Sequence, residues 1–528
     1  MLDTLFKNEN TWINAVNSNS VEEFHNKFDN AVDALKQELG KTYPLIINGK
    51  EVETDKYFEV RSPSDTNLIL AKFSQATKEE AEFAIRSAKQ AFSEWGKTPY
   101  QKRVSVFRDV ADQFSSQKFT LAAIVSMENG KNRLESMGDV DEAIDFLRFY
   151  ADQLEINQGF DKETKSSMPN EKTKSVLKPY GVWGIISPFN FPSAIAIGMS
   201  SGALITGNTI ILKPASDTPL SAFKFVESIY KKIPGGAINL ITGAGSVVGQ
   251  TIVESPLVSG IAFTGSKQVG MSSFQKFTSR MPRPFISEMG GKNPVIVTDS
   301  ADLDKATDGV MKAAFGYGGQ KCSACSRVYV QKNIANQFMK KLAEKTEGIK
   351  IGLPWEKDTF LGPLINETAK KKFEKAVEIA KKDGKIILGG ETLKDGLYGR
   401  GYFVKPTIVT NLSKDHQLVK EELFVPFLSV QEFDNFDDAI KEANNSEYGL
   451  TAGIFSQNKG EIDEFFSKIE AGTIYANRAQ SATTGALVQS QPFVGWKGSG
   501  ISGKGTGGVY YLTQFLREQT QTRCNESE

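Results

Sequence analysis

Cys322 and Cys325 lie close together in the stretch YGGQKCSACS, residues 317–326. Cysteines at this spacing suit three kinds of chemistry: zinc binding, thiol redox exchange or nucleophilic attack on a carbonyl carbon. A zinc site needs about four ligands, and the third cysteine and the two histidines form no second pair. A thioredoxin-type pair opens a helix after a strand, whereas here a strand-like run, SRVYVQ, follows. We therefore predict one nucleophile, Cys322, exposed behind two glycines, with Cys325 in the core and no metal site.

A cysteine nucleophile needs a group that favours loss of its proton, because a free thiol of pKa about 8.5 is mostly protonated at neutral pH. Lys321 is adjacent in sequence, although its side chain need not face the sulfur. Both histidines, His25 in EEFHNK and His416 in SKDHQL, have contexts typical of surface residues. Glu288, in SEMGGKNP, precedes two glycines, and a carboxylate in an apolar pocket can titrate near neutrality. We favour Glu288 as the base, although taken alone it also fits a surface glutamate before a turn.

The chain predicts two α/β units that would position these residues. Short apolar runs alternate with helix-like segments at 181–186, 209–214, 237–242 and 260–265, and a second series follows at 293–298, 326–331, 406–411 and 472–477. Such alternation is typical of doubly wound parallel sheets covered by helices on both faces. We expect the division near residue 288. Before it, the Asn48-Gly49 pair predicts a tight hairpin within 43–52.

The predicted strand ends also offer groups that suit a nucleotide. Lys213 to Ser216 follow one strand, and Gly265-Ser266 follow another and precede a helix, whose free N–H groups would favour a phosphate. The glycine-rich turn 243–249 does not fit the G-x-G-x-x-G spacing, so by itself it also fits a plain structural turn. Ser216 carries no charge that would repel a 2′-phosphate, so both NAD and NADP are open.

Composition limits the class of protein. A chain of 528 residues exceeds one ordinary core, so two large domains are expected. Its formal net charge of 0 shows no basic excess, and we expect no nucleic-acid partner. The most apolar region, 182–212, is interrupted by prolines and asparagines that lipid would not tolerate, so we expect no membrane span. Three cysteines and the absence of a signal-peptide pattern lead us to expect a cytoplasmic protein.

Seven short motifs, in order, resemble those of the aldehyde dehydrogenase superfamily. They are PFNFP (188–192), ILKPAS (211–216), FTGS (263–266), EMGGKNP (288–294), GQKCSA (319–324), EELFVP (421–426) and QPFVGWKGSG (491–500). The resemblance implies a Rossmann-like cofactor domain, a catalytic domain and a small β oligomerisation arm. The expected boundaries are a helical extension at 1–40, a dinucleotide-binding domain at 41–163 and 181–287, a catalytic domain at 288–484, and an oligomerisation arm with a substrate anchor loop at 164–180 and 485–528.

The resemblance also implies roles for individual residues. Cys322 would attack the aldehyde, the Asn190 amide and the Cys322 N–H would hold the resulting oxyanion, and Glu288 would activate water to hydrolyse a thioester. A nicotinamide cofactor, NAD with NADP also possible, would be held by Ser187, Lys213, Ser216, Gly265, Ser266, Glu422 and Phe424. Val425 and Val494 stand where the family usually has glycine, which puts the nicotinamide end and the anchor loop in doubt.

The stretches FGYGGQKCSACSRVYV and GSGISGKGTGGVYYLTQFL most resemble the branch of the family that oxidises L-glutamate γ-semialdehyde. That resemblance implies a carboxylate anchor at Ser323, Gly507 and Gly508, with Phe191 and Phe515 around the aliphatic part. Alternatives are another carboxylated semialdehyde, such as succinate semialdehyde or 2,5-dioxopentanoate, or a cofactor-independent cysteine hydrolase or acyltransferase. A homo-oligomer is expected through 164–180 and 511–524.

Overall fold

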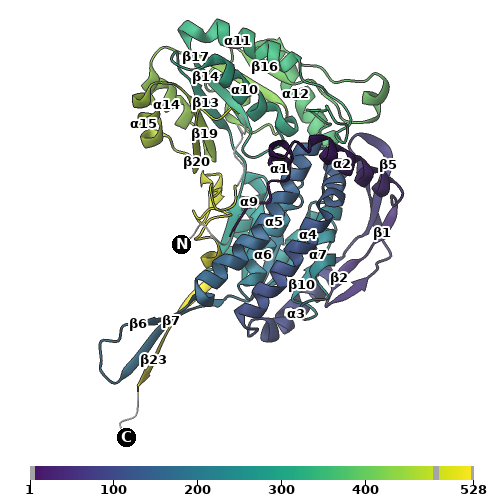
Figure 1. Cartoon of the computed structure of the whole chain (residues 1–528), viewed down its shortest axis with the longest axis vertical. Coiled ribbons are helices and arrows are strands. Elements are labelled where there is room, and N and C mark those ends of the chain that lie inside the picture. Colours follow the sequence, from purple (N-terminus) through teal and green to yellow (C-terminus); the bar gives the residue numbers. More distant parts are fainter. Residues whose placement is uncertain (1–5, 480–486, 525–528) are drawn as a thin grey trace.

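The computed structural model describes residues 6–479 and 487–524, and it contains two α/β units and a projecting arm (Figure 1). The central strands of the first sheet run parallel in the order β12-β11-β8-β9-β10. They are β8 (Val182–Ile186), β9 (Thr209–Lys213), β10 (Ile238–Leu240), β11 (Gly260–Thr264) and β12 (Phe285–Glu288). From β8 the chain proceeds to β9 and β10 on one side, and then returns to form β11 and β12 on the other side of β8. The topological switch point of the sheet therefore lies between β8 and β11. This confirms the predicted doubly wound sheet.

Antiparallel strands complete the edges of this sheet. They are β2 (Leu45–Ile47), β3 (Lys50–Val52) and β22 (Gly500–Ile501). Asn48 and Gly49, between β2 and β3, have φ angles of 54° and 72°, as the predicted hairpin requires. A small separate sheet contains β1 (Lys41–Tyr43), β4 (Tyr57–Ser62) and β5 (Asp65–Ser74). The return of β22 brings the late part of the chain beside Glu288, with which Gly500 is paired.

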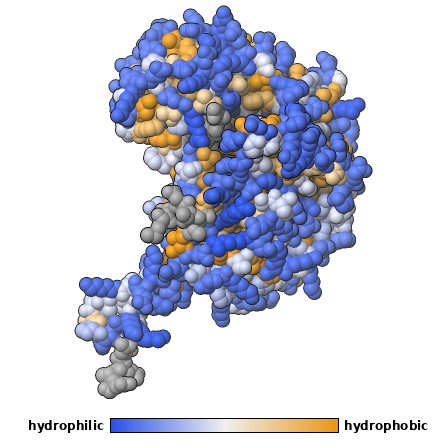
Figure 2. Space-filling view, in the orientation of Figure 1, coloured by the Kyte–Doolittle hydropathy of each residue, from blue (hydrophilic) through white to orange (hydrophobic). Residues whose placement is uncertain are grey.

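Helices cover both faces of the first sheet. They are α3 (Lys78–Trp95), α4 (Tyr100–Asn129), α5 (Arg133–Ile156), α6 (Ala194–Ile205), α7 (Pro219–Ile229), α8 (Gln250–Glu254) and α9 (Lys267–Thr278). The first turn of α3 is fixed by a capping box between Thr77 and Glu80. Helices α4 to α7 share one apolar core with the sheet, whereas α8, α9 and most of α3 share the core on its other face. The outer surface in Figure 2 is mostly hydrophilic, because these helices turn their apolar stripes inward.

The second sheet has the order β15-β16-β17-β14-β13-β19-β20, and only β15 is antiparallel to its neighbour. Its strands are β13 (Asn293–Val297), β14 (Cys325–Gln331), β15 (Lys385–Leu388), β16 (Thr407–Thr410), β17 (Phe427–Phe433), β19 (Thr451–Phe455) and β20 (Thr473–Ala476). Its helices are α10 (Leu303–Phe315), α11 (Lys332–Glu347), α12 (Glu367–Asp383), α13 (Gln417–Lys420), α14 (Phe436–Asn444) and α15 (Lys459–Lys468). Strands β15, β17 and β19 of this sheet, and β12 of the first, were not among the predicted runs. The chain passes from the first sheet to the second between β12 and β13.

The arm is a three-stranded antiparallel sheet that extends away from both units (Figure 1). It consists of β6 (Asp161–Thr164), β7 (Glu171–Pro179) and β23 (Leu516–Cys524), and β7 pairs with β23 along its whole length. The chain between residue 487 and β23 is called the late segment (residues 487–515), and a two-stranded pair, β18 (Tyr448–Gly449) with β21 (Trp496–Lys497), joins this segment to the second unit. The expected boundary at 484/485 lies outside the described residues.

The N-terminal segment is helical from α1 (Thr11–Asn17) to α2 (Val21–Lys36), and both helices pack on the first unit. His25 of α2 is buried and its ring contacts the Arg133 guanidinium, so the expected surface position of His25 is wrong. Its apolar neighbours Trp12 and Phe24 cover the ring, a contact that a local sequence window does not reveal. None of the helices over 6–479 and 487–524 is long and apolar enough to cross a membrane.

Candidate active site

The cysteine loop, residues 316–324, connects α10 to β14 and begins with a short 3-10 turn, Gly316–Gly319. Tyr317, Gly318 and Gly319 all have positive φ, at 48°, 62° and 66°. A Cβ atom at Gly319 would lie 2.6 Å from the carbonyl oxygen of Val425, so only glycine fits there. The turn delivers Cys322, half-buried, into a pocket, and Cys325 starts β14 within the core. The two cysteines therefore occupy different environments, as predicted.

Asn293, at the start of β13, holds the cysteine loop in place. Its Nδ2 donates to the carbonyl oxygens of Cys322, at 2.7 Å, and Ala324, at 2.9 Å. Its Oδ1 accepts the N–H of Thr451 at 3.0 Å. One buried amide thus joins the nucleophile to β13 and β19. We did not predict this role, although Asn293 lies within the quoted motif EMGGKNP.

The sulfur of Cys322 lies in an environment that disfavours its anion. Burial raises the pKa of the thiol, and the carboxyls of Glu422 and Glu288 raise this pKa further, against a smaller lowering by the N–H groups of Ser323 and Cys322. Lys321 does not offset this effect, because its Nζ pairs with Glu135 at 2.6 Å. These effects favour the neutral thiol of Cys322 over its thiolate.

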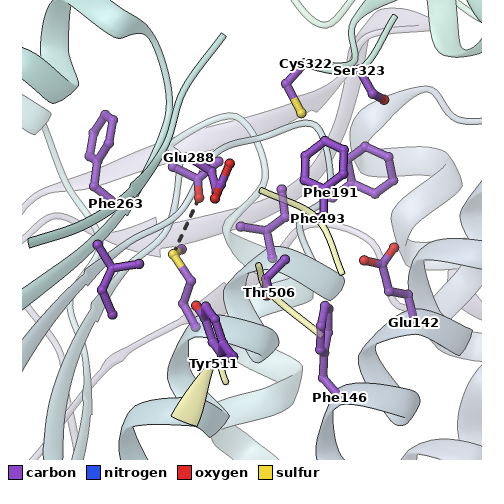
Figure 3. A pocket seen from close by; sticks show the side chains of 14 residues that line it. Glu142, Phe146, Phe191, Phe263, Glu288, Cys322, Ser323, Phe493, Thr506 and Tyr511 are labelled. Carbon is purple, nitrogen blue, oxygen red and sulfur yellow. Dashed lines mark hydrogen bonds between the residues drawn. The ribbon is translucent and has the colours of Figure 1, made fainter. Parts of the chain in front are cut away.

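Glu288 is the last residue of β12 and lines the same pocket as Cys322 (Figure 3). Burial raises its pKa well above the usual range, and the N–H of Gly495 is the group that lowers it. Among the described residues, its Oε2 atom has no hydrogen-bond partner. A buried carboxyl with a free oxygen has the geometry and the raised pKa of a general base that acts near neutral pH.

The pocket is a mostly apolar cavity with about 630 Å³ of empty space, counted to its opening. Its walls are formed by Glu142, Phe146, Phe191, Ile195, Met199, Phe263, Thr264, Ile286, Glu288, Cys322, Ser323, Phe493, Thr506 and Tyr511. Glu142 projects into it from α5, on the opposite side from Glu288 (Figure 3). No lysine or arginine is among these lining residues. Burial raises the pKa of Glu142 well above the usual range, and the nearby Asp139 raises it further.

The predicted residues Cys322, Glu288, Ser323 and Phe191 meet in this pocket. The structure also adds lining residues that we did not predict: Glu142, Phe146, Phe493, Thr506 and Tyr511. Glu142 and Phe146 lie on α5, outside the quoted motifs, whereas the other three lie within the quoted stretches 491–500 and 498–516 without having been singled out. Asp139 and Asp145 lie three residues before and after Glu142 on the same helix, so no local pattern singles out Glu142.

Other predicted substrate residues lie outside the pocket lining. Phe515 is fully buried against Trp183, with ring centroids 4.6 Å apart. The N–H of Gly507 donates to the Tyr150 hydroxyl at 3.1 Å, and the N–H of Gly508 donates to the Gly505 carbonyl at 3.2 Å. Both glycine N–H groups therefore already have acceptors in this conformation.

Asn190 follows β8 at the switch point of the first sheet and is buried. The loop that carries it is held by Asn129, whose Nδ2 donates to the carbonyl oxygens of Phe189, at 2.9 Å, and Asn190, at 3.5 Å. Asn129 is the last residue of α4, and its own carbonyl accepts the hydroxyl of Tyr317 at 2.9 Å. The same residue thus links the Asn190 loop to the cysteine loop.

Groups that suit a dinucleotide gather at the carboxyl ends of the first sheet. Ser187, after β8, has a buried hydroxyl without a partner among the described residues. Burial lowers the pKa of Lys213, at the end of β9, to about 8, and its Nζ contacts the carbonyl of Pro214. Ser266 caps α9, whose free N–H groups suit a phosphate. A buried orphan hydroxyl, a lysine and a helix N-terminus fit the ribose and pyrophosphate of a nicotinamide cofactor.

The remaining predicted cofactor residues flank this region. The Ser216 hydroxyl lies 3.4 Å from the Gly243 carbonyl, and the Gly265 N–H donates to the Glu288 carbonyl at 3.2 Å. Glu422 is turned inward, where its Oε1 accepts the N–H of Gly291 at 2.8 Å.

Phe424 has a φ of 59° and contacts Phe189 edge to face, with ring centroids 5.8 Å apart. Val425 and Val494, which replace family glycines, do not have the left-handed backbone conformation of Phe424, because neither has a positive φ. Val425 is buried in the apolar core of the second unit, and its carbonyl faces Gly319. The backbone here therefore accepts a side chain at both valine positions.

These two sheets, with a thiol and a buried carboxyl facing one pocket, have the layout of an aldehyde-oxidising enzyme that uses a dinucleotide. The sequence profile of the aldehyde dehydrogenase family matches residues 50–521. The chain belongs to the aldehyde dehydrogenase family.

Individual relatives are similar along almost the whole chain. 1-Pyrroline-5-carboxylate dehydrogenase of Geobacillus sp. (strain WCH70) is 36% identical over 508 residues, which cover 95% of this chain and 96% of that protein. 1-Pyrroline-5-carboxylate dehydrogenase 2 of Bacillus subtilis (strain 168) is 36% identical over 526 residues, covering 98% and 99%. The crystal structure of a Thermus 1-pyrroline-5-carboxylate dehydrogenase with bound NAD superimposes with a TM-score of 0.93 at 33% identity, covering 99% of this chain and 100% of that chain.

Proposed function

We propose that this enzyme oxidises L-glutamate γ-semialdehyde, the open form of 1-pyrroline-5-carboxylate, to L-glutamate in proline and arginine catabolism, with NAD as the cofactor. The relatives named above support this reaction, and the NAD-bound Thermus structure supports the cofactor. The observation that carries the choice of substrate is Glu142, which faces the pocket from the side opposite Glu288.

Glu142 favours a substrate whose far end bears a cation. Glutamate γ-semialdehyde carries an α-ammonium and an α-carboxylate, so its head is zwitterionic. An ammonium beside Glu142 would form a charge-assisted hydrogen bond and restore the ionised form of this carboxyl. Succinate semialdehyde and 2,5-dioxopentanoate have a carboxylate and no ammonium, and no cation among the lining residues offsets their charge. The pocket therefore favours the amino acid semialdehyde over these two alternatives.

Cys322 provides the nucleophile in the proposed mechanism. The ionised form of Glu288, which lines the same pocket, takes the proton of the thiol, and the sulfur attacks the aldehyde carbon to form a thiohemiacetal. The Asn190 amide and the Cys322 N–H would hold the oxygen of this adduct, a type of contact worth about 10²–10³ in rate. Asn293 fixes the loop that presents the sulfur, so that the attacking atom does not have to be ordered at each turnover.

Glu288 completes the reaction. Bound NAD supplies the acceptor for the hydride that leaves the thiohemiacetal carbon, so that a thioester on Cys322 remains. Glu288, once ionised, takes a proton from water, and the resulting hydroxide attacks the thioester carbon and releases glutamate. Ser187, Lys213 and the N-terminus of α9 would hold the ribose and pyrophosphate of the cofactor. The apolar walls exclude other water from the reacting centre.

A substrate panel tests the proposal. Absorbance at 340 nm should rise with pyrroline-5-carboxylate and NAD, and the kcat/KM for succinate semialdehyde should be lower by about tenfold or more, the value of one charged contact. The same panel with NADP decides the cofactor preference. If succinate semialdehyde is the better substrate, the assignment of the pocket to an amino acid head fails. If neither cofactor is reduced while thioesters are hydrolysed, the enzyme is a hydrolase.

We also propose that the arm joins copies of this chain. Its three strands project from the body, and an isolated ribbon of this size is marginal unless it is paired or covered. At its base, Tyr510 and Val509 are 70% and 46% exposed. Sedimentation velocity should show a dimer or larger assembly for the native chain and dissociation for Tyr510→Asp. A monomeric native chain would exclude this role.

A further inference from the structure

The segment between Phe6 and α1 lies across the outer side of α5. The Glu9 N–H donates to Asp145 Oδ1 at 2.8 Å. The Thr11 N–H and hydroxyl both donate to Asp141, each at 2.7 Å. Phe6 contacts Phe149 edge to face, with ring centroids 5.3 Å apart. This segment is therefore held by an ordered set of contacts along two turns of one helix.

Helix α5 is also a wall of the substrate pocket. Glu142 and Phe146, four residues apart on one face, line the pocket (Figure 3). Asp141 and Asp145 occupy the adjacent row and bind the N-terminal segment. The helix thus has substrate-facing residues next to residues that the N-terminal segment holds.

Asn8 connects this helix to the opposite wall. Its Nδ2 donates both to Asp145 Oδ2, at 2.7 Å, and to the carbonyl of Val488, at 3.3 Å. Val488 is buried, and a Cβ at Gly507 would lie 3.2 Å from its Cα atom. The next residue, Gln489, donates its N–H to the Gly507 carbonyl at 2.9 Å.

The wall formed by Phe493 and Thr506 continues from this contact. Their backbone groups exchange two hydrogen bonds, at 3.0 and 2.9 Å. On the inner side, the Tyr150 hydroxyl of α5 contacts Thr506 Oγ1 at 3.2 Å and accepts the Gly507 N–H. Helix α5 is thus joined to the late segment directly, through residues such as Tyr150, and also indirectly, through Asn8 of the N-terminal segment.

We propose that residues 6–11 act as a brace that sets the distance between the two walls of the substrate pocket, with Asn8 as a positioning residue for substrate binding. Asn8 touches neither the reacting sulfur nor the pocket, so its effect reaches the substrate through Val488 and Gly507. The kinetic consequence rests on the proposed function, because it concerns the semialdehyde. The structural consequence does not, because it concerns the order of residues 487–508 in the free enzyme.

Asn8→Ala tests the brace, with Asn17→Ala as the matched control. Asn17 is the exposed last residue of α1, and it is not in contact with α5 or Val488 through any hydrogen bond of the described residues. In the full-length enzyme, Asn8→Ala removes both hydrogen bonds of the amide and should raise the KM for pyrroline-5-carboxylate about threefold to tenfold, because only the contact with Val488 acts on the opposite wall. The kcat and the KM for NAD should change less than twofold. Amide hydrogen exchange in peptides from 487–508 should become faster without substrate.

Two outcomes would overturn the brace. One is exchange of 487–508 in Asn8→Ala that equals the exchange in Asn17→Ala. The other is a parallel loss of kcat for every substrate, which would indicate a general loss of folded enzyme. Thr11→Val, which removes one bond to Asp141 and leaves Asn8 in place, gives a second test. It should leave 487–508 as protected as in the control, because the contact with Val488 is intact. If the enzyme did not oxidise the semialdehyde at all, the exchange measurement would still decide whether the brace exists.

Discussion

Cys322 and Glu288 lie beside strands of the two sheets, whereas Glu142 and Thr506 come from a long helix and from the late segment. We call the part of the pocket formed by Cys322 and Glu288 its catalytic end, and the part formed by Glu142 and Thr506 its substrate end. At the catalytic end, Asn293 fixes the backbone of the cysteine loop. At the substrate end, the walls are joined by side chains from distant parts of the chain, including Asn8 and Tyr150. One end is thus positioned by sheet edges and short loops, and the other by packing between separate segments.

This difference indicates that separate parts of the structure control the chemical steps and the choice of substrate. A change at the catalytic end should remove turnover for every aldehyde. A change at the substrate end should alter which aldehyde is preferred and leave the rate of the chemical steps nearly intact. Four substitutions test this division.

The largest effect is expected for Cys322→Ala. Without the sulfur, no covalent adduct forms, so kcat should fall by about 10⁴-fold or more for every aldehyde. Cys325→Ala is the matched control, because Cys325 is buried at the start of β14 and does not line the pocket. NADH formation at 340 nm measures both variants. Residual turnover in Cys322→Ala above one part in a thousand would show that another group performs the first step.

The catalytic end is also the part that the sequence predicted best. Cys322 and Glu288 lie in short motifs, and Cys322 comes shortly before the predicted strand run 326–331, so local patterns were sufficient to place them in one pocket. The two doubly wound sheets followed from the same runs. Glu142 was not predicted, because its role depends on which face of α5 meets the late segment.

Contacts between remote segments limited the sequence analysis elsewhere as well. The local sequence around His25 is typical of a surface residue, but Trp12 and Arg133 cover its ring. The free N–H groups expected at Gly507 and Gly508 are used by Tyr150 and Gly505. In each case the partner lies far away in the chain or in a loop whose geometry no residue type fixes.

Asn293→Ala should weaken both the fold and the catalytic end. It would leave the carbonyls of Cys322 and Ala324 and the N–H of Thr451 without their partner, and unpaired buried groups cost about 1–3 kcal/mol each. Partial relaxation should limit the loss of unfolding free energy to about 3 kcal/mol, and kcat should fall for all aldehydes. Denaturant unfolding and steady-state kinetics measure these effects. Asn333→Ala, which removes one exposed hydrogen bond, is the control. An unchanged kcat would show that the cysteine loop does not need this anchor.

Glu142→Gln should alter substrate preference and not the chemistry. Loss of the carboxylate removes the partner of the substrate ammonium, so the KM for pyrroline-5-carboxylate should rise about tenfold. The KM for succinate semialdehyde should stay the same, because this substrate has no ammonium to pair with Glu142. Glu155→Gln, on the exposed side of α5, is the control. Equal losses for both substrates would place Glu142 in the catalytic end and remove the division between the two ends.

For Glu288→Gln we predict a change in the pH dependence of the free energy of unfolding, and this is the smallest of the four expected effects. The pKa of Glu288 is higher in the folded protein than in the unfolded chain. Above the ordinary glutamate range, the unfolded chain therefore binds fewer protons than the folded protein does. This glutamate therefore makes the native protein lose stability with rising pH up to its folded pKa, and glutamine does not. The stability gained by Glu288→Gln should increase by about 1 kcal/mol between pH 5.5 and 6.5, just above the ordinary glutamate range, against no such trend for the exposed Glu163→Gln. Urea unfolding of both variants at the two pH values measures this difference. A pH-independent gain would mean that Glu288 is already ionised in the free enzyme, and that the apolar pocket does not hold it as the neutral acid.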